Sequence, residues 1–330
     1  MKLRLVFVGE NDWASCAFRV AQALNAYYGE TVARTVVANS HPFGYENDIC
    51  VQEHGLSKAF DKGVGHLAEG DAAWVFTTGD GTVALTNLFF DRLAKMKTFR
   101  TGRVRLLRGA FHIGTAYRSS PDMYDRVDRE LGVSVRFISP DSIRLSPDPG
   151  VWDLPYCHAI GGFSASYIEP ISIPAIVHSP SNRGTKGSDA IEKVVDSLRS
   201  EFNFEWRCIS GVSYSECVRM REAGHIFIGQ LNPAVGGFGY SSVEAAAQGM
   251  VPIASQCLTP ESVWSDAGLS VPPVLSASDP EELRAVLVKL LKDPNLLCTL
   301  RRRANRWAHF GDVSLLGSGA YYAAQLEKRS

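Results

Sequence analysis

Short apolar runs alternate with amphipathic segments along the chain, and this alternation sets the expected architecture. Residues 3–8 are apolar apart from Arg4 and end at Gly9, as in a strand buried on both faces of a parallel sheet. Residues 14–24 then have apolar positions at helical spacing. Further strands are predicted at 32–38, 72–77, 104–107 and 133–138, with a helix over 83–96. Strands that alternate with helices predict a parallel sheet covered on both faces.

The second half repeats the pattern. Strands are predicted at 175–177, 204–209, 226–229 and 251–254, and helices from Ser188 and at 214–222, 241–248, 280–291, 294–308 and 314–328. We therefore predict an α/β protein with two Rossmann-like domains, each built on a parallel sheet. The expected divisions are a first domain over 1–160, a linker over 161–174 rich in turn residues, a second domain over 175–310 and a terminal segment over 311–330.

Two loops directly before helices of the second half carry the chemistry. The first stands in HSPSNRGTKGSDAIEKVVDSL and holds Arg183 and Lys186; the second stands in GGFGYSSVEAAAQGMVPIAS and holds Gly237, Gly239 and Glu244. A helix N-terminus presents unpaired N–H groups and a partial positive charge, so it favours phosphate. Glycines allow close backbone approach to a ligand. Both loops therefore suit a phosphorylated ligand.

The charged side chains divide the task. Arg183 can clamp phosphate oxygens with its planar fork, and Lys186 adds a mobile point charge. Glu244 only accepts hydrogen bonds when ionised, so it suits paired hydroxyls such as those of a ribose. Each feature also has a plain structural interpretation: a Gly-rich turn often only connects a strand to a helix, the cations are ordinary surface charges, and the glutamate complements the helix dipole. The two loops in this order are more specific, and predict a site for a diphosphate joined to a polyhydroxyl group.

Both motifs resemble the C-terminal domain of GT-B glycosyltransferases, above all the large retaining family four. The first motif is matched by His178, Pro180, Arg183, Lys186 and Gly187. The second is matched by Gly237, Phe238, Gly239, Glu244, Ala245, Gly249 and Pro252. The resemblance implies a GT-B fold with its sheets facing a cleft, an N-terminal acceptor domain and a C-terminal helix that crosses back to it.

The resemblance also implies residue roles. Arg183 and Lys186 bind the donor diphosphate, and Glu244 binds the nucleotide ribose. The complete expected donor-binding set is Arg183, Lys186, Gly237, Phe238, Gly239, Ser241, Ser242 and Glu244. One position differs from the family motif: Gly236 stands where the family has a glutamate that contacts the transferred sugar. The identity of the sugar therefore stays open.

The first half offers two candidates for catalysis. Asp12 follows the first predicted strand, where it either orients an acceptor hydroxyl or caps the next helix. His112, with Gly114 beside it, loosely matches a family histidine near the donor sugar; a lone loop histidine is otherwise a structural residue. We expect the strand before His112 to end near Leu107. Asp12, His112, Arg183 and Lys186 together form the predicted catalytic set.

The resemblance implies an enzyme that transfers a sugar from a nucleoside diphosphate sugar, expected to be a UDP-sugar, to an acceptor hydroxyl. Retention, no metal and no prosthetic group are implied. The acceptor is a glycan, a lipid-linked sugar or a hydroxymethylated base in DNA. Alternatives are a sugar-nucleotide epimerase or phosphorylase on the same fold, or a non-catalytic nucleotide-sugar binding protein.

Net charge, cysteines and the basic stretch narrow the expected partners and location of the protein. The formal net charge of the 330 residues is −1, so no global field recruits nucleic acid or anionic membrane. Seven dispersed cysteines without zinc spacing, together with the lack of a long apolar stretch, lead us to expect a cytoplasmic protein with no transmembrane segment. One basic stretch over 95–108 is either a solvated helix end or a contact for a polyanion such as DNA or lipid head groups.

Overall fold

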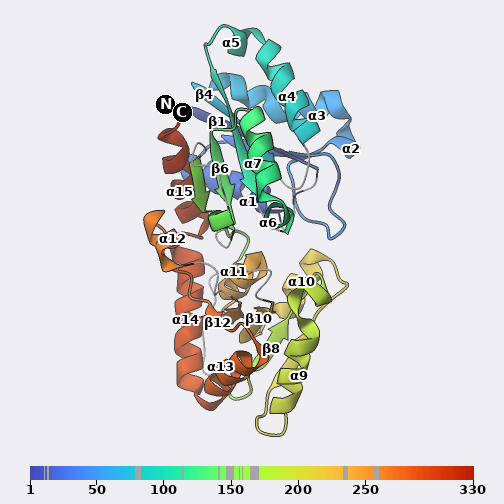
Figure 1. Ribbon diagram of the computed structural model, residues 1–330, viewed down its shortest axis with the longest axis vertical. Helices are drawn as coiled ribbons and strands as arrows, with labels where there is room; N and C mark the ends of the chain where they lie inside the picture. The colour runs from blue at the N-terminus through green and yellow to red at the C-terminus, as the bar shows by residue number, and fades with distance from the viewer. Residues whose placement is uncertain are drawn as a thin grey trace. The chain divides into compact units, whose positions relative to one another are not determined.

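The chain folds into two compact units, Met1–Gly161 together with Leu315–Ser330, and Gly162–Ser314. The computed structural model describes residues 1–10, 12, 15–78, 83–112, 115–139, 142–145, 152–155, 157, 159–163, 171–232, 237–255 and 260–330. Figure 1 shows the helices and strands of each unit, coloured along the chain. Part of the predicted linker, residues 164–170, lies outside the described residues.

The first unit contains a parallel sheet. Its described strands are β1 (Leu3–Gly9), β2 (Ala33–Val37), β3 (Ile49–Cys50), β4 (Ala72–Thr78), β5 (Arg105–His112), β6 (Val135–Ile138) and β7 (Trp152–Pro155). Their order is β3-β2-β1-β4-β5-β6-β7, and every described pair is parallel. The described helices are α1 (Cys16–Tyr28), α2 (Val51–His54), α3 (Leu56–Val64), η2 (Gly65–Glu69), α4 (Val83–Lys95), α5 (Lys97–Arg100), α6 (Thr115–Ser119), α7 (Pro121–Glu130), η3 (Ile143–Leu145) and α15 (Leu315–Glu327).

Alternate residues of these strands supply two separate cores. Val6, Val8 and Val75 pack with Phe60 of α3 and Phe89 of α4 on one face. The opposite face carries an aromatic layer that includes Phe7, Phe76, Phe111, Phe137 and Tyr322 of α15. The period of two in a pleated strand explains how one apolar run serves both faces.

The terminal helix α15 lies against α1 in this unit. A Cβ on Gly319 would lie 2.3 Å from the carbonyl oxygen of Ala23, so only glycine permits this approach of the two helices. Tyr322 anchors the helix further, since its hydroxyl donates to the carbonyl oxygen of Cys157 at 2.7 Å. The last residues of the chain thus complete the first unit.

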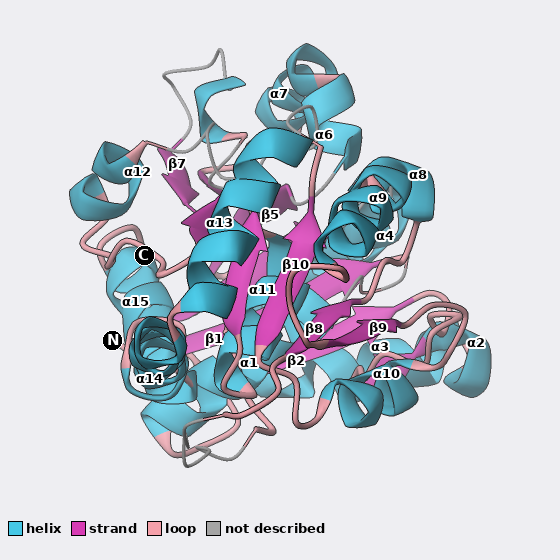
Figure 2. Cartoon of the chain, turned by 90° about the horizontal axis from the view of Figure 1, so that it is seen from below, coloured by secondary structure: helices cyan, strands magenta, loops and turns pink. Residues whose placement is uncertain are grey.

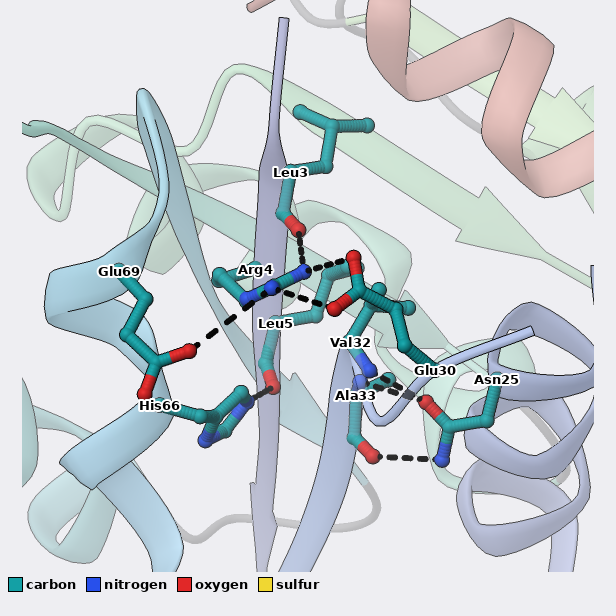
Figure 3. Close-up of polar contacts among 9 residues, drawn as sticks. All are labelled: Leu3, Arg4, Leu5, Asn25, Glu30, Val32, Ala33, His66 and Glu69. Atoms are coloured by element: carbon teal, nitrogen blue, oxygen red, sulfur yellow. Dashed lines mark hydrogen bonds and ion pairs between the residues drawn. The ribbon is translucent and has the colours of Figure 1, made fainter. Parts of the chain in front are cut away.

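An ion pair between a buried arginine and a partly exposed glutamate lies at the edge where the strands of this sheet begin (Figure 3). Arg4 is 1% exposed, and its guanidinium contacts both carboxylate oxygens of Glu30, at 3.3 and 3.0 Å. It also donates to the carbonyl oxygen of Leu3 at 3.1 Å, and Glu69 approaches it to 3.9 Å. The polar groups at this amino edge therefore hold strands and connections together, and the predicted site residues Asp12 and His112 stand at the opposite, carboxyl edge.

The second unit contains another parallel sheet, of order β12-β11-β10-β8-β9. Its described strands are β8 (Ala175–His178), β9 (Glu205–Cys208), β10 (Ile226–Gln230), β11 (Val251–Ala254) and β12 (Leu275–Ser276). Its described helices are α8 (Arg183–Lys186), α9 (Ser188–Leu198), α10 (Tyr214–Arg221), α11 (Gly239–Ala247), α12 (Glu261–Asp266), α13 (Pro280–Lys292) and α14 (Pro294–Phe310).

Helices again cover both faces (Figure 2). Ile226 and Ile228 face the apolar stripes of α9 and α13, whereas Phe227 between them faces Ala245 of α11 and the residues near α10. Both sheets thus have the architecture that the alternation of strands and helices predicts. The main differences lie in β5, which runs on to His112, and in α7, whose charged residues gave no apolar stripe to recognise.

Candidate functional site

The first of the two loops singled out in the sequence is hydrogen-bonded to the connection that leads to the second. The amide of Leu231, which follows β10, donates to the carbonyl oxygen of Lys186 at 3.0 Å, and Asn232 Nδ2 donates to the carbonyl oxygen of Thr185 at 3.0 Å. Gly187 has φ +68°, and a Cβ there would lie 2.6 Å from the carbonyl oxygen of Leu231. Glycine at this position therefore lets the first loop pack onto the connection that leads to the second.

This packing brings a cation to the start of α11. A Cβ on Gly239, the first residue of that helix, would lie 3.9 Å from Lys186 Nζ. Gly237 and Gly239 both have positive φ, 63° and 67°, which glycine adopts without strain. Gln230 Nε2 donates to the carbonyl oxygen of Gly237 at 2.5 Å and fixes the turn. An ammonium group beside a helix N-terminus is an arrangement that attracts an anion.

Side chains of α14 hold the other end of α11. Arg301 Nε donates to the carbonyl oxygen of Gly249 at 2.7 Å, and Asn305 Nδ2 donates to that of Ala247 at 2.9 Å. His309 Nε2 lies 2.9 Å from the same Ala247 oxygen. These groups pair with carbonyls at the C-terminal end, where a cation also complements the helix dipole. The helix that presents the glycines is thus anchored at its far end.

The remaining predicted donor residues of this loop differ in exposure. Phe238 is 4% exposed, and its ring centroid lies 5.9 Å from that of Trp264 and 6.5 Å from that of Trp307. Ser242 is fully buried and donates to the carbonyl oxygen of Phe238 at 2.6 Å. Ser241 is half-buried. Phe238 and Ser242 therefore support the turn from the interior, and Gly236 lies outside the described residues.

Arg183 is engaged by carboxylates. Its guanidinium makes a bidentate pair with Glu192 of α9, at 3.0 and 2.7 Å, and contacts Asp189 at 3.0 Å. These hydrogen bonds, that of Glu192 above all, raise the pKa of Arg183 above its usual range, and Arg183 in turn lowers the pKa of Glu192. The Arg183 side chain is 43% exposed. It is therefore a cation at the surface whose orientation is set by two acidic neighbours.

Glu244 has protein donors on both carboxylate oxygens. Tyr214 OH donates to Oε1 at 2.8 Å, and Arg221 Nη2 donates to Oε2 at 2.7 Å. Glu244 and Arg221 are both almost fully buried. Burial lowers the pKa of Arg221, but the Glu244 carboxylate outweighs it and the net shift is upward. Each oxygen of the Glu244 carboxylate thus accepts a hydrogen bond from the protein.

His178, the conspicuous histidine of the first motif, is a link within the fold. Its Nδ1 lies 2.7 Å from the carbonyl oxygen of Ile228 and its Nε2 lies 2.8 Å from Ser188 Oγ. Burial lowers its pKa to about 4, so the ring is neutral at pH 7. It ties the end of β8 to β10 and to the first residue of α9.

In the first unit, His112 is the last residue of β5 and belongs to a buried polar cluster. Its Nε2 lies 2.6 Å from Asp128 Oδ2, and its ring stacks on Tyr117 with centroids 4.8 Å apart. Asp128 also lies 3.6 Å from Arg136 Nη1, which pairs with buried Asp125. The strand end predicted near Leu107 is therefore wrong, because the apolar and small residues up to 111 continue the sheet. Its expected neighbour, the glycine at 114, lies outside the described residues.

Asp12 caps α1. Its Oδ1 accepts from the amide of Ala17 at 3.0 Å and its Oδ2 from that of Phe18 at 2.8 Å. Burial raises the pKa of Asp12 to about 6 despite these hydrogen bonds. The geometry favours the capping role over a hydroxyl-orienting one.

The basic stretch lies away from these residues. Lys95, Lys97, Arg100 and Arg103 are exposed around α5, which precedes the start of β5 and so lies at the amino edge. Arg108 instead lies over the ring of Phe90 at 3.7 Å. The stretch therefore does not form one continuous patch, and its exposed part is at the edge opposite to His112.

Two further features concern ions and membranes. Within the part of the chain that the structure describes, no three His, Cys, Asp or Glu side chains are grouped so that they could hold a metal ion. None of the described helices combines the length and apolar composition that a membrane span requires.

Sequence reasoning missed four residues around the loops: Glu192, Tyr214, Arg221 and Gln230. Gln230 gave a usable signal, since an amide at the carboxyl end of a buried strand stands where ligands bind. The other three lie on helices as ordinary polar residues, and no spacing distinguishes them. Their role comes from the partner that the fold brings beside each.

Comparison with known proteins bears on the fold. The chain matches no protein-family model and no curated protein sequence. Among solved structures it is similar to an alpha-glucosyltransferase in complex with UDP-glucose and DNA containing an abasic site, with 12% identity, a TM-score of 0.64 and 99% of each chain covered.

Two further solved structures extend the likeness. A glycosyltransferase from Rickettsia africae has 11% identity, a TM-score of 0.58 and 99% of each chain covered. HepE from Anabaena, in complex with UDP, has 12% identity and a TM-score of 0.57, covering 99% of this chain and 100% of its own. Together with the two parallel sheets, these matches show that the chain has the GT-B fold.

Proposed function

We propose that this protein is a glycosyltransferase that moves a sugar from a nucleoside diphosphate sugar to an acceptor hydroxyl. The observation that carries the proposal is the position of Lys186 Nζ beside the first residue of α11. Hydrogen bonds between the first loop and the connection that leads to the second support this position. A diphosphate there would meet the ammonium group and the N-terminal amides together. The GT-B fold supports it, because solved proteins of that fold with UDP or UDP-glucose bound are similar to this chain over their whole length.

The donor site would use the second unit. Lys186, Gly237, Gly239 and the half-buried Ser241 would surround the diphosphate, with Arg183 as a second cation at its margin. To bind phosphate, the Arg183 guanidinium must weaken or break its ion pairs with Glu192 and Asp189. We therefore expect Arg183 to contribute less to the free energy of diphosphate binding than Lys186 does.

The nucleotide ribose would bind at Glu244. Tyr214 and Arg221 donate to its two oxygens and so orient the carboxylate. UDP is the nucleotide we propose. Because Gly236 replaces the family's glutamate, the motif does not identify the transferred sugar. We also propose that the chain belongs to retaining family four.

In the reaction, the bond between the anomeric carbon and the diphosphate oxygen breaks and a bond from that carbon to the acceptor oxygen forms. With retention, the departing phosphate oxygen takes the acceptor proton, and no protein nucleophile or metal is required. Lys186 and the α11 amides would stabilise the charge that develops on the diphosphate. His112 is proposed to lie near the transferred sugar, with Asp128 holding its Nε2.

Turnover of radiolabelled UDP-glucose tests the proposal, with transfer products and free UDP both measured. Lys186→Ala should strongly reduce donor turnover and Arg183→Ala should reduce it less, while circular dichroism shows an intact fold. Unchanged turnover in both variants would sink the assignment. Isomerised donor without an acceptor would indicate an epimerase, and phosphate-dependent release of sugar phosphate a phosphorylase. Intact donor despite measurable binding would indicate a binding protein.

A further inference from the structure

The long connection between β2 and β3, residues 38–48, begins at the carboxyl edge of the first sheet. The amide of Ala38 donates to the carbonyl oxygen of Gly9 at 2.9 Å, at the end of β1. Ser40 Oγ donates to Glu53 of α2 at 2.9 Å. These contacts place the start of this connection beside the ends of β1 and β2; Figure 1 draws it in blue near α2. We call residues 38–48 the aromatic loop.

Three rings gather at the tip of the aromatic loop. The His41 and Tyr45 ring centroids are 4.6 Å apart, and those of Phe43 and Tyr45 are 6.2 Å apart with their planes at 85°. The amide of Gly44 donates to the carbonyl oxygen of His41 at 2.9 Å, and its φ of +69° turns the chain between the two outer rings. His41 is buried beneath, whereas Phe43 and Tyr45 are half-buried. Each outer ring therefore leaves part of its surface to solvent.

The charges around this loop are negative. Glu10, Glu46 and Glu53 are all exposed. No lysine or arginine stands in the stretches that directly follow β1, β2, β4 and β5, which are residues 10–15, 38–48, 79–82 and 113–114. The nearest cations beyond them in sequence are Arg19, Arg34 and Arg118, and Arg144 stands in the connection that follows β6. By sequence, these four stretches therefore supply none of the basic side chains that neutralise a nucleic-acid backbone.

We infer that the aromatic loop is the acceptor subsite and that it takes the ring of an uncharged sugar. Aromatic faces offer large apolar contact area to the C–H face of a sugar, and exposed carboxylates accept hydrogen bonds from its hydroxyls. Sites for unpaired nucleic-acid bases also use aromatic rings, but they combine them with a positively charged groove. The inference rests on the proposed function, and it selects a neutral glycan over hydroxymethylated DNA as the acceptor.

One group of exposed basic residues agrees with this choice. Lys95, Lys97, Arg100 and Arg103 lie around α5 at the amino edge, the side of the sheet away from the strand ends. A polyanion bound by these residues would lie at the amino edge, away from the aromatic loop. Charge and chemistry at the aromatic loop thus both indicate an uncharged, polyhydroxylated ligand.

The experiment measures binding of the full chain, saturated with UDP, to an array of neutral oligosaccharides and to duplex DNA that contains a hydroxymethylated pyrimidine. Phe43→Leu and Tyr45→Leu remove one ring each and keep an apolar side chain. Tyr27→Leu on α1 is the matched control, because Tyr27 is a 47% exposed aromatic remote from this loop in sequence. We expect glycan binding to weaken about fivefold to tenfold in each ring variant and to stay unchanged in the control.

Two results would overturn the inference: wild-type protein that binds the modified DNA and no neutral glycan, or glycan binding that is equal in wild type and both ring variants. Titration with UDP distinguishes a failure of the proposed glycosyltransferase function from a failure of the acceptor role of the aromatic loop. Both ring variants should bind UDP as wild type does. Failure of the wild-type protein to bind UDP would contradict the proposed function, whereas the array, repeated without UDP, still decides the role of the loop.

Discussion

The replacement of Lys186 by methionine tests the proposed diphosphate site most directly. Methionine keeps the length and apolar stem of the side chain and removes the charge. Lys186 Nζ lies 3.9 Å from the Cβ position on Gly239, so a phosphate oxygen at the α11 N-terminus would stand about 4 Å or less from the ammonium. A pair of unit charges at about 4 Å contributes about 4 kcal/mol at an effective dielectric constant of about 20.

Solvent reduces this figure, because the Lys186 side chain is half-buried. We therefore expect a loss of about 2 kcal/mol, or about 30-fold in the dissociation constant for UDP. The α11 amides remain, so binding should weaken and not vanish. Isothermal titration calorimetry at low ionic strength measures the effect, which should shrink as salt is added.

The control is Lys193→Met, which removes an exposed lysine from α9 in the same unit. It should leave the dissociation constant for UDP within about twofold of wild type, since a surface charge remote from the ligand contributes little. Equal affinity of wild type and Lys186→Met would refute the reasoning. An equal loss in both lysine variants would show that only the general charge of the unit matters.

Three further predictions concern other charged groups. Burial raises the pKa of Asp12 to about 6, so the folded state holds its proton more tightly than the unfolded state and stability falls as pH rises from about 4 to 6; urea unfolding should show a loss of about 3 kcal/mol across this window that Asp12→Asn removes, and an equal slope in both proteins would contradict the assignment. Glu192→Gln should strengthen UDP binding about twofold to fivefold, because Arg183 loses its bidentate partner; weaker binding would show that the carboxylate is needed to orient the guanidinium. Arg221→Met should lower the free energy of unfolding by about 3–5 kcal/mol, because it leaves Glu244 buried without its cation; the double variant with Glu244→Gln should recover part of the loss, and full additivity would argue against coupling.

The periodicity of apolar residues was enough to predict most strands and helices, and the second half most closely. The segment 251–254 is a strand as predicted, and the helix predicted over 280–291 is α13. Burial on both faces makes such strands continuously apolar, which is a strong local signal. The polar helix α7 and the short strand β3 gave no such signal, since a charged helix or a two-residue strand has too few apolar positions to show a period.

The sequence by itself determined the two α/β sheets and placed two glycine-containing loops before helices, because these features depend on residues close together along the chain. Only the tertiary structure decided the partners of the charged side chains. Glu244 proved to be paired with Arg221, 23 residues earlier, and Asp12 to cap a helix with both oxygens. A buried charge requires a partner, but the identity of that partner depends on which elements the sheet order brings together, and local sequence does not contain that order.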